Sequence, residues 1–443
     1  MRLHRKVRYV HPPCVCLEQR RYIVNNKIVS SRSLSTLDKL DVLRFISANL
    51  VILCHLIDQF IVGKFGYEDP LGIGHLNCWL GIMAVFCFFV LSGYVITFSV
   101  MNKYRKTGRF DLKTYISRRF FRIYPTALCS LVYMLCIVLI MKVLGLNGLD
   151  SSGFKLDGYV SGVPNYLSGL SFLYSIFLPP SGYFGGFFNV AMWTLSYEFG
   201  FYVCFGVIFY LKTNYGAMKS AMLVGFTSCS LFVWHTTNFN IGNVEKESMS
   251  GLILNFLKVF PSWNFLLFFM VWSLGVFLYY LMVKNSFSMQ ALISLSCLAS
   301  VLMLIANRYF DVPFNYNVYS GMSALSDPEW SPIMTFSYGI WMMLFVYLIV
   351  NIEFKAGLLH LISAFGRRYS FTLYVTHYGM INLAFGLLWN LFDKFTLTEH
   401  VLLFLSLMIL TNIIAYYLST LFEHRDMWKN VFNKLTTRAE GSP

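Results

Sequence analysis

Residues 40–62 read LDVLRFISANLVILCHLIDQFIV, and this stretch decides the fold class. It is long and apolar enough to cross a bilayer as one helix, because about 20 residues span the hydrocarbon core. Further runs of the same kind lie at 78–100, 122–144, 190–211, 218–236, 263–283, 288–306, 333–351, 371–392 and 399–422. We therefore predict an all-α integral membrane protein with about ten transmembrane helices.

The composition of the whole chain agrees with this prediction. Of the 443 residues, 57% are hydrophobic and only 13% are charged, about half the ~25% charged residues of a soluble domain. This excludes a cytosolic enzyme, a disordered chain and a secreted disulfide scaffold. Most cysteines lie in or beside apolar runs, and the close pair Cys14 and Cys16 has no histidine cluster to complete a zinc site. We expect neither a disulfide framework nor a metal site.

The positive charge is unevenly distributed between the apolar runs. If both termini are cytoplasmic, 26 Lys and Arg residues fall in the inside segments and 6 in the outside segments. This asymmetry predicts cytoplasmic N- and C-termini. It also explains the net charge of +14 without a nucleic-acid partner. We expect a basic, disordered tail over 1–36, a transmembrane domain over 37–424 and a short cytoplasmic tail over 425–443; the oligomeric state stays open.

The first apolar run contains three ionisable residues, Arg44, His55 and Asp58. Such residues are costly inside a bilayer and indicate function. From Arg44 to His55 a helix turns about 1100° and advances about 16 Å, so both side chains project from one face. Asp58, one turn further, can accept a hydrogen bond from the imidazole. The alternative is that Arg44 anchors the helix at the cytoplasmic surface and His55 bridges two helices.

Other polar residues lie in or beside later runs. Glu198 is predicted at a depth similar to that of His55, where the two can act as a general acid and base; alternatively it is a structural partner of a Trp or Tyr. Arg119 and Arg122 are neighbours on a helix and suit phosphate groups, although a plain cytoplasmic anchor explains them equally well. His377 is either a second site residue or part of a hydrogen bond between helices.

Five segments, in chain order, resemble signatures of the acyltransferase-3 family of bacterial membrane proteins. The first is the pair Arg44 and His55, separated by ten residues. The others run from Phe88 to Tyr94, from Arg118 to Pro125, from Trp193 to Glu198 and from Ser370 to His377. The resemblance covers about residues 37–424. The hydrolase-like C-terminal domain of some family members is not expected here.

The resemblance implies an O-acyltransferase of the bacterial inner membrane. It would move an acyl group, most often acetyl, from cytoplasmic acyl-CoA to a hydroxyl of a surface polysaccharide or a lipid-linked precursor. O-antigen of lipopolysaccharide and exopolysaccharide are both open as acceptors, and succinyl-CoA is open as a donor. No cofactor would be bound, since acetyl-CoA is a substrate. Burial disfavours the charged imidazole, so His55 would act as a neutral base or carry the acyl group.

The predicted site residues fall into three groups. The catalytic group is His55, Glu198, Arg44 and Asp58. The acyl-CoA-binding group is Arg44, Arg118, Arg119, Arg122 and Tyr124. The further candidates are Ser92, Asn189, Trp193, Tyr374 and His377.

Two other classes of protein fit part of the pattern. A proton-coupled transporter or flippase also carries buried Arg, His and Glu residues. Against it, the chain has no evident internal repeat and no matching pair of interrupted helices. A non-catalytic assembly protein would not need polar residues aligned along one helix face.

Overall fold

A computed structural model describes residues 34–57, 59–60, 73–146, 193–216, 263–284, parts of 288–301, 332–354, 357–388, 390–424 and parts of 427–430. Within these residues the chain is helical throughout and contains no strand, as predicted. The long helices are α1 (Thr36–Ile57), α3 (Ile73–Thr107), α4 (Leu112–Val143), α8 (Trp193–Tyr215), α11 (Trp263–Lys284), α13 (Pro332–Asn351), α14 (Gly357–Leu388) and α15 (Leu397–Phe422). A short 3-10 turn, η6 (Phe392–Lys394), precedes α15.

Six of the described helices are long and apolar enough to cross a membrane, so the chain is a multi-pass membrane protein. Their apolar spans are Thr36–Ile57, Leu80–Thr107, Leu112–Val143, Leu267–Lys284, Gly357–Leu388 and Thr398–Phe422, and Thr335–Asn351 is a shorter apolar helix. The predicted runs coincide with described helices except for 218–236, which lies outside the described residues, and 288–306, of which only parts are described. The total of ten spans and the cytoplasmic termini therefore stay predictions. The predicted basic tail, before residue 34, also lies outside the described residues.

Several helices begin and end where capping residues predict. The side chain of Asp111 accepts a hydrogen bond of 3.1 Å from the backbone N–H of Lys113 and so caps α4. Thr396 and Glu399 form a reciprocal capping box at the start of α15. Gly108, just after α3, has φ of 64°, a conformation that glycine adopts without strain.

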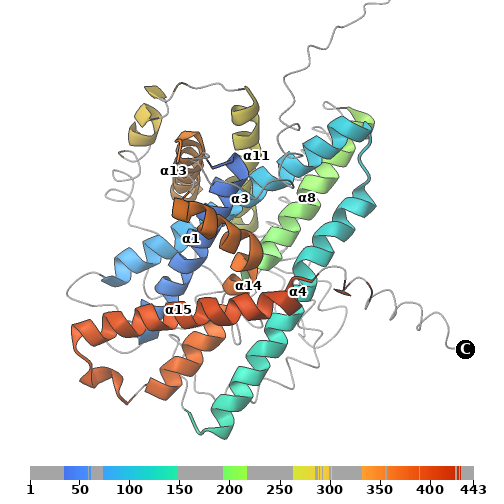
Figure 1. Ribbon diagram of the computed structural model, residues 1–443. Helices are drawn as coiled ribbons and strands as arrows, with labels where there is room; N and C mark the ends of the chain where they lie inside the picture. The colour runs from blue at the N-terminus through green and yellow to red at the C-terminus, as the bar shows by residue number, and fades with distance from the viewer. Residues whose placement is uncertain are drawn as a thin grey trace, which may run out of the picture.

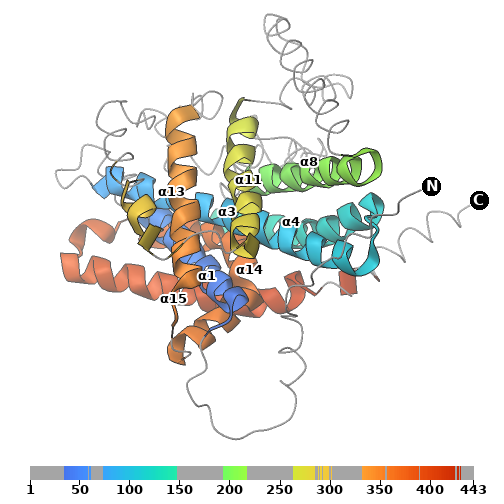
Figure 2. The same cartoon turned by 90° about the horizontal axis from the view of Figure 1, so that it is seen from above.

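Helix α1 lies in the middle of the bundle, packed between α14 and α3 (Figures 1 and 2). On the far side of α3 lies α11, which also contacts α13. On the other side α14 contacts α15 and α4, and α4 in turn contacts α8. In Figure 1, α15 runs across the face of α14 toward α4. The first predicted span is thus surrounded by protein, which suits a helix that carries ionisable side chains.

A glycine sets the close contact between α1 and α14. A methyl group at Gly366 would lie 2.8 Å from the carbonyl carbon of Asp41, closer still to its oxygen, and 3.3 Å from Cβ of Phe45. Only glycine permits this approach, as at small-residue crossings of other membrane helices. The contact of Gly366 with Asp41, and that of His377 with His55 further along, show that α1 and α14 run in parallel.

Candidate active site

Two histidines from different helices stack in the bundle. The rings of His55 (α1) and His377 (α14) have centroids 5.3 Å apart and an interplanar angle of 24°. The ring of Tyr378 packs edge-on against His55 at 5.5 Å, and that of Tyr374 lies 6.0 Å from His377. His377 is completely buried. The sequence left its role open, and the structure places it directly against the predicted base.

The hydrogen bonding of His377 defines its tautomer. Its Nδ1 lies 3.2 Å from the carbonyl oxygen of Leu373, which can only accept, so Nδ1 carries the proton. Nε2 is then an acceptor. Within the described part of the chain this buried Nε2 has no hydrogen-bond partner. An unsatisfied buried polar group costs about 1–3 kcal/mol, so a donor on a bound substrate would be favoured at this position.

Glu198 lies in a second group of polar side chains, where α3, α8 and α11 meet. Its Oε1 accepts hydrogen bonds from Ser92 Oγ at 2.7 Å and from the hydroxyl of Tyr202. Trp272 Nε1 donates to Ser92 Oγ at 3.2 Å. The structure thus brings together the predicted residues Ser92 and Glu198. The sequence could have indicated Tyr202, because it lies one helical turn after Glu198. It could not have indicated Trp272, since only the packing of α11 brings that residue to Ser92.

A hydrogen bond connects the helix of Glu198 to that of His377. The hydroxyl groups of Thr194 and Tyr374 are 2.8 Å apart. The ring of Tyr374 in turn packs against Phe88 at 5.3 Å and against His377. The predicted residue Tyr374 therefore lies between the two polar groups. A direct pairing of His55 with Glu198 stays a prediction.

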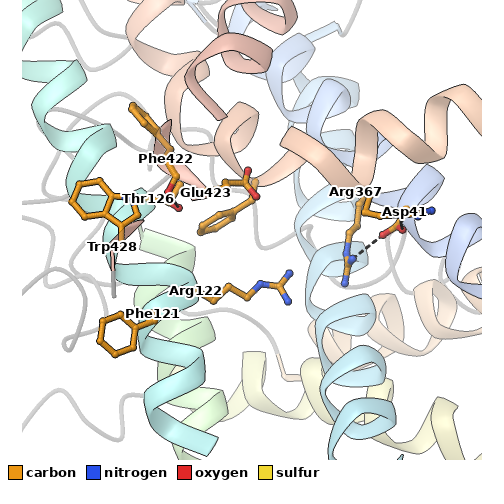
Figure 3. A pocket seen from close by; sticks show the side chains of 10 residues that line it. Asp41, Phe121, Arg122, Thr126, Arg367, Phe422, Glu423 and Trp428 are labelled. Carbon is orange, nitrogen blue, oxygen red and sulfur yellow. Dashed lines mark hydrogen bonds and ion pairs between the residues drawn. The ribbon is translucent and has the colours of Figure 1, made fainter. Parts of the chain in front are cut away.

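A polar cavity of about 210 Å³ lies among α1, α4, α14 and the C-terminal end of α15 (Figure 3). We call it the arginine cavity, and it is lined by Asp41, Arg44, Phe121, Arg122, Thr126, Arg367, Phe371, Phe422, Glu423 and Trp428. In Figure 3 the guanidinium of Arg122 points into the space that faces Arg367. Arg44 and Arg122 both belong to the predicted acyl-CoA-binding group. Arg367 was missed, because in the sequence it looks like an ordinary charge before an apolar run.

Ion pairs hold two of these guanidinium groups in place. Asp41 accepts from Arg44 at 2.9 Å through Oδ1 and from Arg367 at 3.2 Å through Oδ2. Arg367 also binds Oδ1 of Asp38 at 2.6 Å, and Ser363 donates to the same oxygen at 3.0 Å. These ion pairs therefore clamp α1 and α14 together beside the cavity. Fixed guanidinium groups are well suited to bind phosphate.

The rest of the predicted arginine motif lies elsewhere. The guanidinium of Arg119 lies over the rings of Tyr115, at 5.5 Å, and Tyr202, at 5.8 Å. Arg118 is exposed, and Tyr124 stacks on Phe120 with centroids 4.5 Å apart. None of these three predicted donor-binding residues lines the arginine cavity, so their role in donor binding stays a prediction.

Three predicted residues cannot be placed in the site. Asp58 and Asn189 lie outside the described residues, as does the side chain of Trp193. The described residues also hold no group of three or more His, Cys, Asp or Glu side chains that could bind a metal ion.

The arginine cavity and the histidine pair lie along the same two helices. Arg44 at the cavity and His55 in the pair are both on α1, where the helix advances about 16 Å between them. Between them, Ala48 and Val51 are buried against the neighbouring helices. The arrangement is the arginine cavity beside the first half of α1 and a pair of imidazoles further along α1 and α14.

The family model described as "Acyltransferase domain" matches residues 37–420. The chain belongs to the acyltransferase-3 family. This member is 33% identical over 164 residues to acyltransferase MdmB of Streptomyces mycarofaciens, a match covering 37% of this chain and 36% of the relative. It is 40% identical over 73 residues to O-acetyltransferase OatA of Staphylococcus aureus, covering 16% of this chain and 12% of the relative. The chain thus matches about a third or less of the length of these relatives, and no solved structure matches it.

Proposed function

We propose that this acyltransferase-3 protein is an O-acyltransferase of the bacterial inner membrane. It transfers an acyl group, acetyl in the first instance, from cytoplasmic acyl-CoA to a hydroxyl of a surface polysaccharide or its lipid-linked precursor. The observation that carries this proposal is the stacked histidine pair, His55 and the buried His377, on two of the helices that line the arginine cavity. The names of the relatives, an acyltransferase and an O-acetyltransferase, agree with it.

The donor binds first at the arginine cavity. Acyl-CoA is polyanionic, and Arg44, Arg122 and Arg367 line one chamber in which charge-assisted hydrogen bonds to phosphate can form. The thioester is carried on the flexible arm of the donor. From the cavity this arm extends along α1 toward His55, about 16 Å deeper.

The histidine pair then acts on the acceptor. His55 removes the proton of the acceptor hydroxyl while that oxygen attacks the thioester carbonyl carbon. A C–O bond forms, the C–S bond breaks, and the departing thiolate takes the proton back from the imidazole to give free CoA. Nε2 of His377 accepts a hydrogen bond from a neighbouring hydroxyl of the sugar and orients it, which satisfies that buried atom.

The carboxylates have supporting roles in this proposal. Asp58 orients the imidazole of His55. Glu198, hydrogen-bonded to Ser92 and Tyr202, relays the proton or holds α8 against α3 through its bond with Ser92.

Reconstituted transfer tests the proposal. The full chain in liposomes is given radiolabelled acetyl-CoA and surface glycan, and acyl transfer is followed by mass spectrometry of the glycan. His55→Ala is expected to lower the transfer rate by about 10²-fold or more, the usual contribution of a general base. Unchanged transfer by this variant at a normal membrane level would remove His55 from the mechanism. Uptake of glycan without any acyl transfer would instead support a transporter.

A further inference from the structure

We infer that Trp428 supplies a stacking surface for the nucleobase of a nucleotide-bearing donor, at one side of the arginine cavity. Trp428 and Glu423 both line this cavity, yet they follow residue 420, where the family match ends. The inference rests on the proposed function for the identity of the donor. Its test measures nucleotide binding, which does not depend on acyl transfer.

The cavity has an aromatic side and a cationic side. Figure 3 shows Trp428 and Phe121 on one side, Arg367 with Asp41 on the other, and the guanidinium of Arg122 between them. A nucleotide has the matching division into an aromatic base and anionic phosphates. A volume of about 210 Å³ is below the ~300–1,000 Å³ of a pocket for a whole small molecule. The cavity therefore encloses one end of a donor, and the remainder extends beyond it.

The indole of Trp428 is held in a defined position. Its Nε1 donates to the carbonyl oxygen of Leu421 at 3.1 Å, and its backbone N–H donates to that of His424 at 3.2 Å. The end of α15 is in turn bound to α4, because Thr126 Oγ1 donates to the carbonyl oxygen of Phe422 at 3.1 Å. Since the polar edge of the indole is already used, its face is the part that remains for a ligand. Stacking on a base needs only that face.

The carboxylates in the cavity do not prevent anion binding. Asp41 accepts from Arg44 and Arg367, and an oxygen of Glu423 accepts from both the backbone N–H and the hydroxyl of Thr372, at 3.2 and 2.7 Å. The cavity still has one guanidinium more than it has carboxylates. Its net positive charge and the aromatic side together favour a nucleotide. Inorganic phosphate or a lipid headgroup would use the guanidinium groups alone.

The test compares two substitutions at one position. Trp428→Leu and Trp428→Phe both lose the hydrogen bond to Leu421, but only Phe keeps an aromatic face. Binding of adenosine 3′,5′-bisphosphate to the full chain in phosphatidylcholine nanodiscs is measured by calorimetry. We expect Leu to raise Kd by about tenfold and Phe to stay within about threefold of the wild type, as for the loss and retention of base stacking. Trp341→Ala, in the apolar groove beside α13, is the matched control and should leave Kd unchanged.

The outcomes separate the inference from the proposed function. Equal effects of Leu and Phe, no effect of Leu, or no nucleotide binding by the wild type would overturn the stacking role. Pyrophosphate should bind the wild type and the Leu variant equally. In nanodiscs with phosphatidylglycerol, nucleotide binding is expected to persist, and its loss there would assign the cavity to a lipid headgroup. Nucleotide binding that depends on the ring at 428, in a protein without acyl transfer, would support the inference and refute the proposed function.

Discussion

Gly366→Ala tests whether the contact between α1 and α14 sets the geometry of the site. The added methyl group would lie 2.8 Å from the carbonyl carbon of Asp41 and closer to its oxygen. Contacts of Cβ atoms below 3.0 Å essentially never occur, so one helix has to move away from the other. Overpacking of this kind costs about 1–3 kcal/mol of stability.

The same movement disturbs both parts of the candidate site. Asp41 holds Arg44 and Arg367 at the cavity, and the histidine pair lies further along the same two helices. A displacement on the order of 1 Å at a reacting group lowers the rate by about 10²-fold. We therefore expect Gly366→Ala to fold with a lower melting temperature and to lose about 10²-fold in transfer rate.

Thermal unfolding in detergent and acetyl transfer in liposomes measure the two effects. Gly386→Ala, on the same helix, is the control, since its methyl group would lie 3.2 Å from the flexible end of Met141 and 3.3 Å from Cβ of Leu146, with no contact below 3.0 Å. The control should keep nearly normal stability and activity. Wild-type stability and rate in Gly366→Ala would show that the two helices are not held at this distance and would refute the reasoning.

Two further substitutions test single side chains of the site. Arg367→Ala should raise the KM for acyl-CoA by about tenfold or more, because a charge-assisted hydrogen bond to phosphate is lost. Steady-state kinetics compares this variant with Arg368→Ala, whose guanidinium lies over Tyr416. Equal KM values in the two variants would count against a contact of Arg367 with the donor. His377→Ala should raise the KM for the glycan by about tenfold and leave the KM for acyl-CoA unchanged; a matched rise in both constants would mean a general disturbance of the bundle.

The sequence alone determines the helical architecture and the family. Apolar runs of about 20 residues form membrane-spanning helices, because a helix satisfies all its backbone hydrogen bonds within the bilayer. The described helices coincide with the predicted runs in the part of the chain that the structure describes. The helical period also fixes Arg44 and His55 on one face of α1, since both lie on a single helix. Ser92 and Glu198 were both singled out by the resemblance, and they are hydrogen-bonded in the structure.

The tertiary structure decides which helices contribute to each polar group. The hydropathy of a segment shows that it is apolar. It does not show how the resulting helix is rotated or which helix packs beside it. The position of His377 against His55 and that of Arg367 beside Asp41 both depend on the close approach of α1 and α14 at Gly366. Trp272 reaches Ser92 in the same way, through packing between segments far apart in the chain. Such contacts are made by the rotation and spacing of packed helices, which no single segment of the sequence specifies.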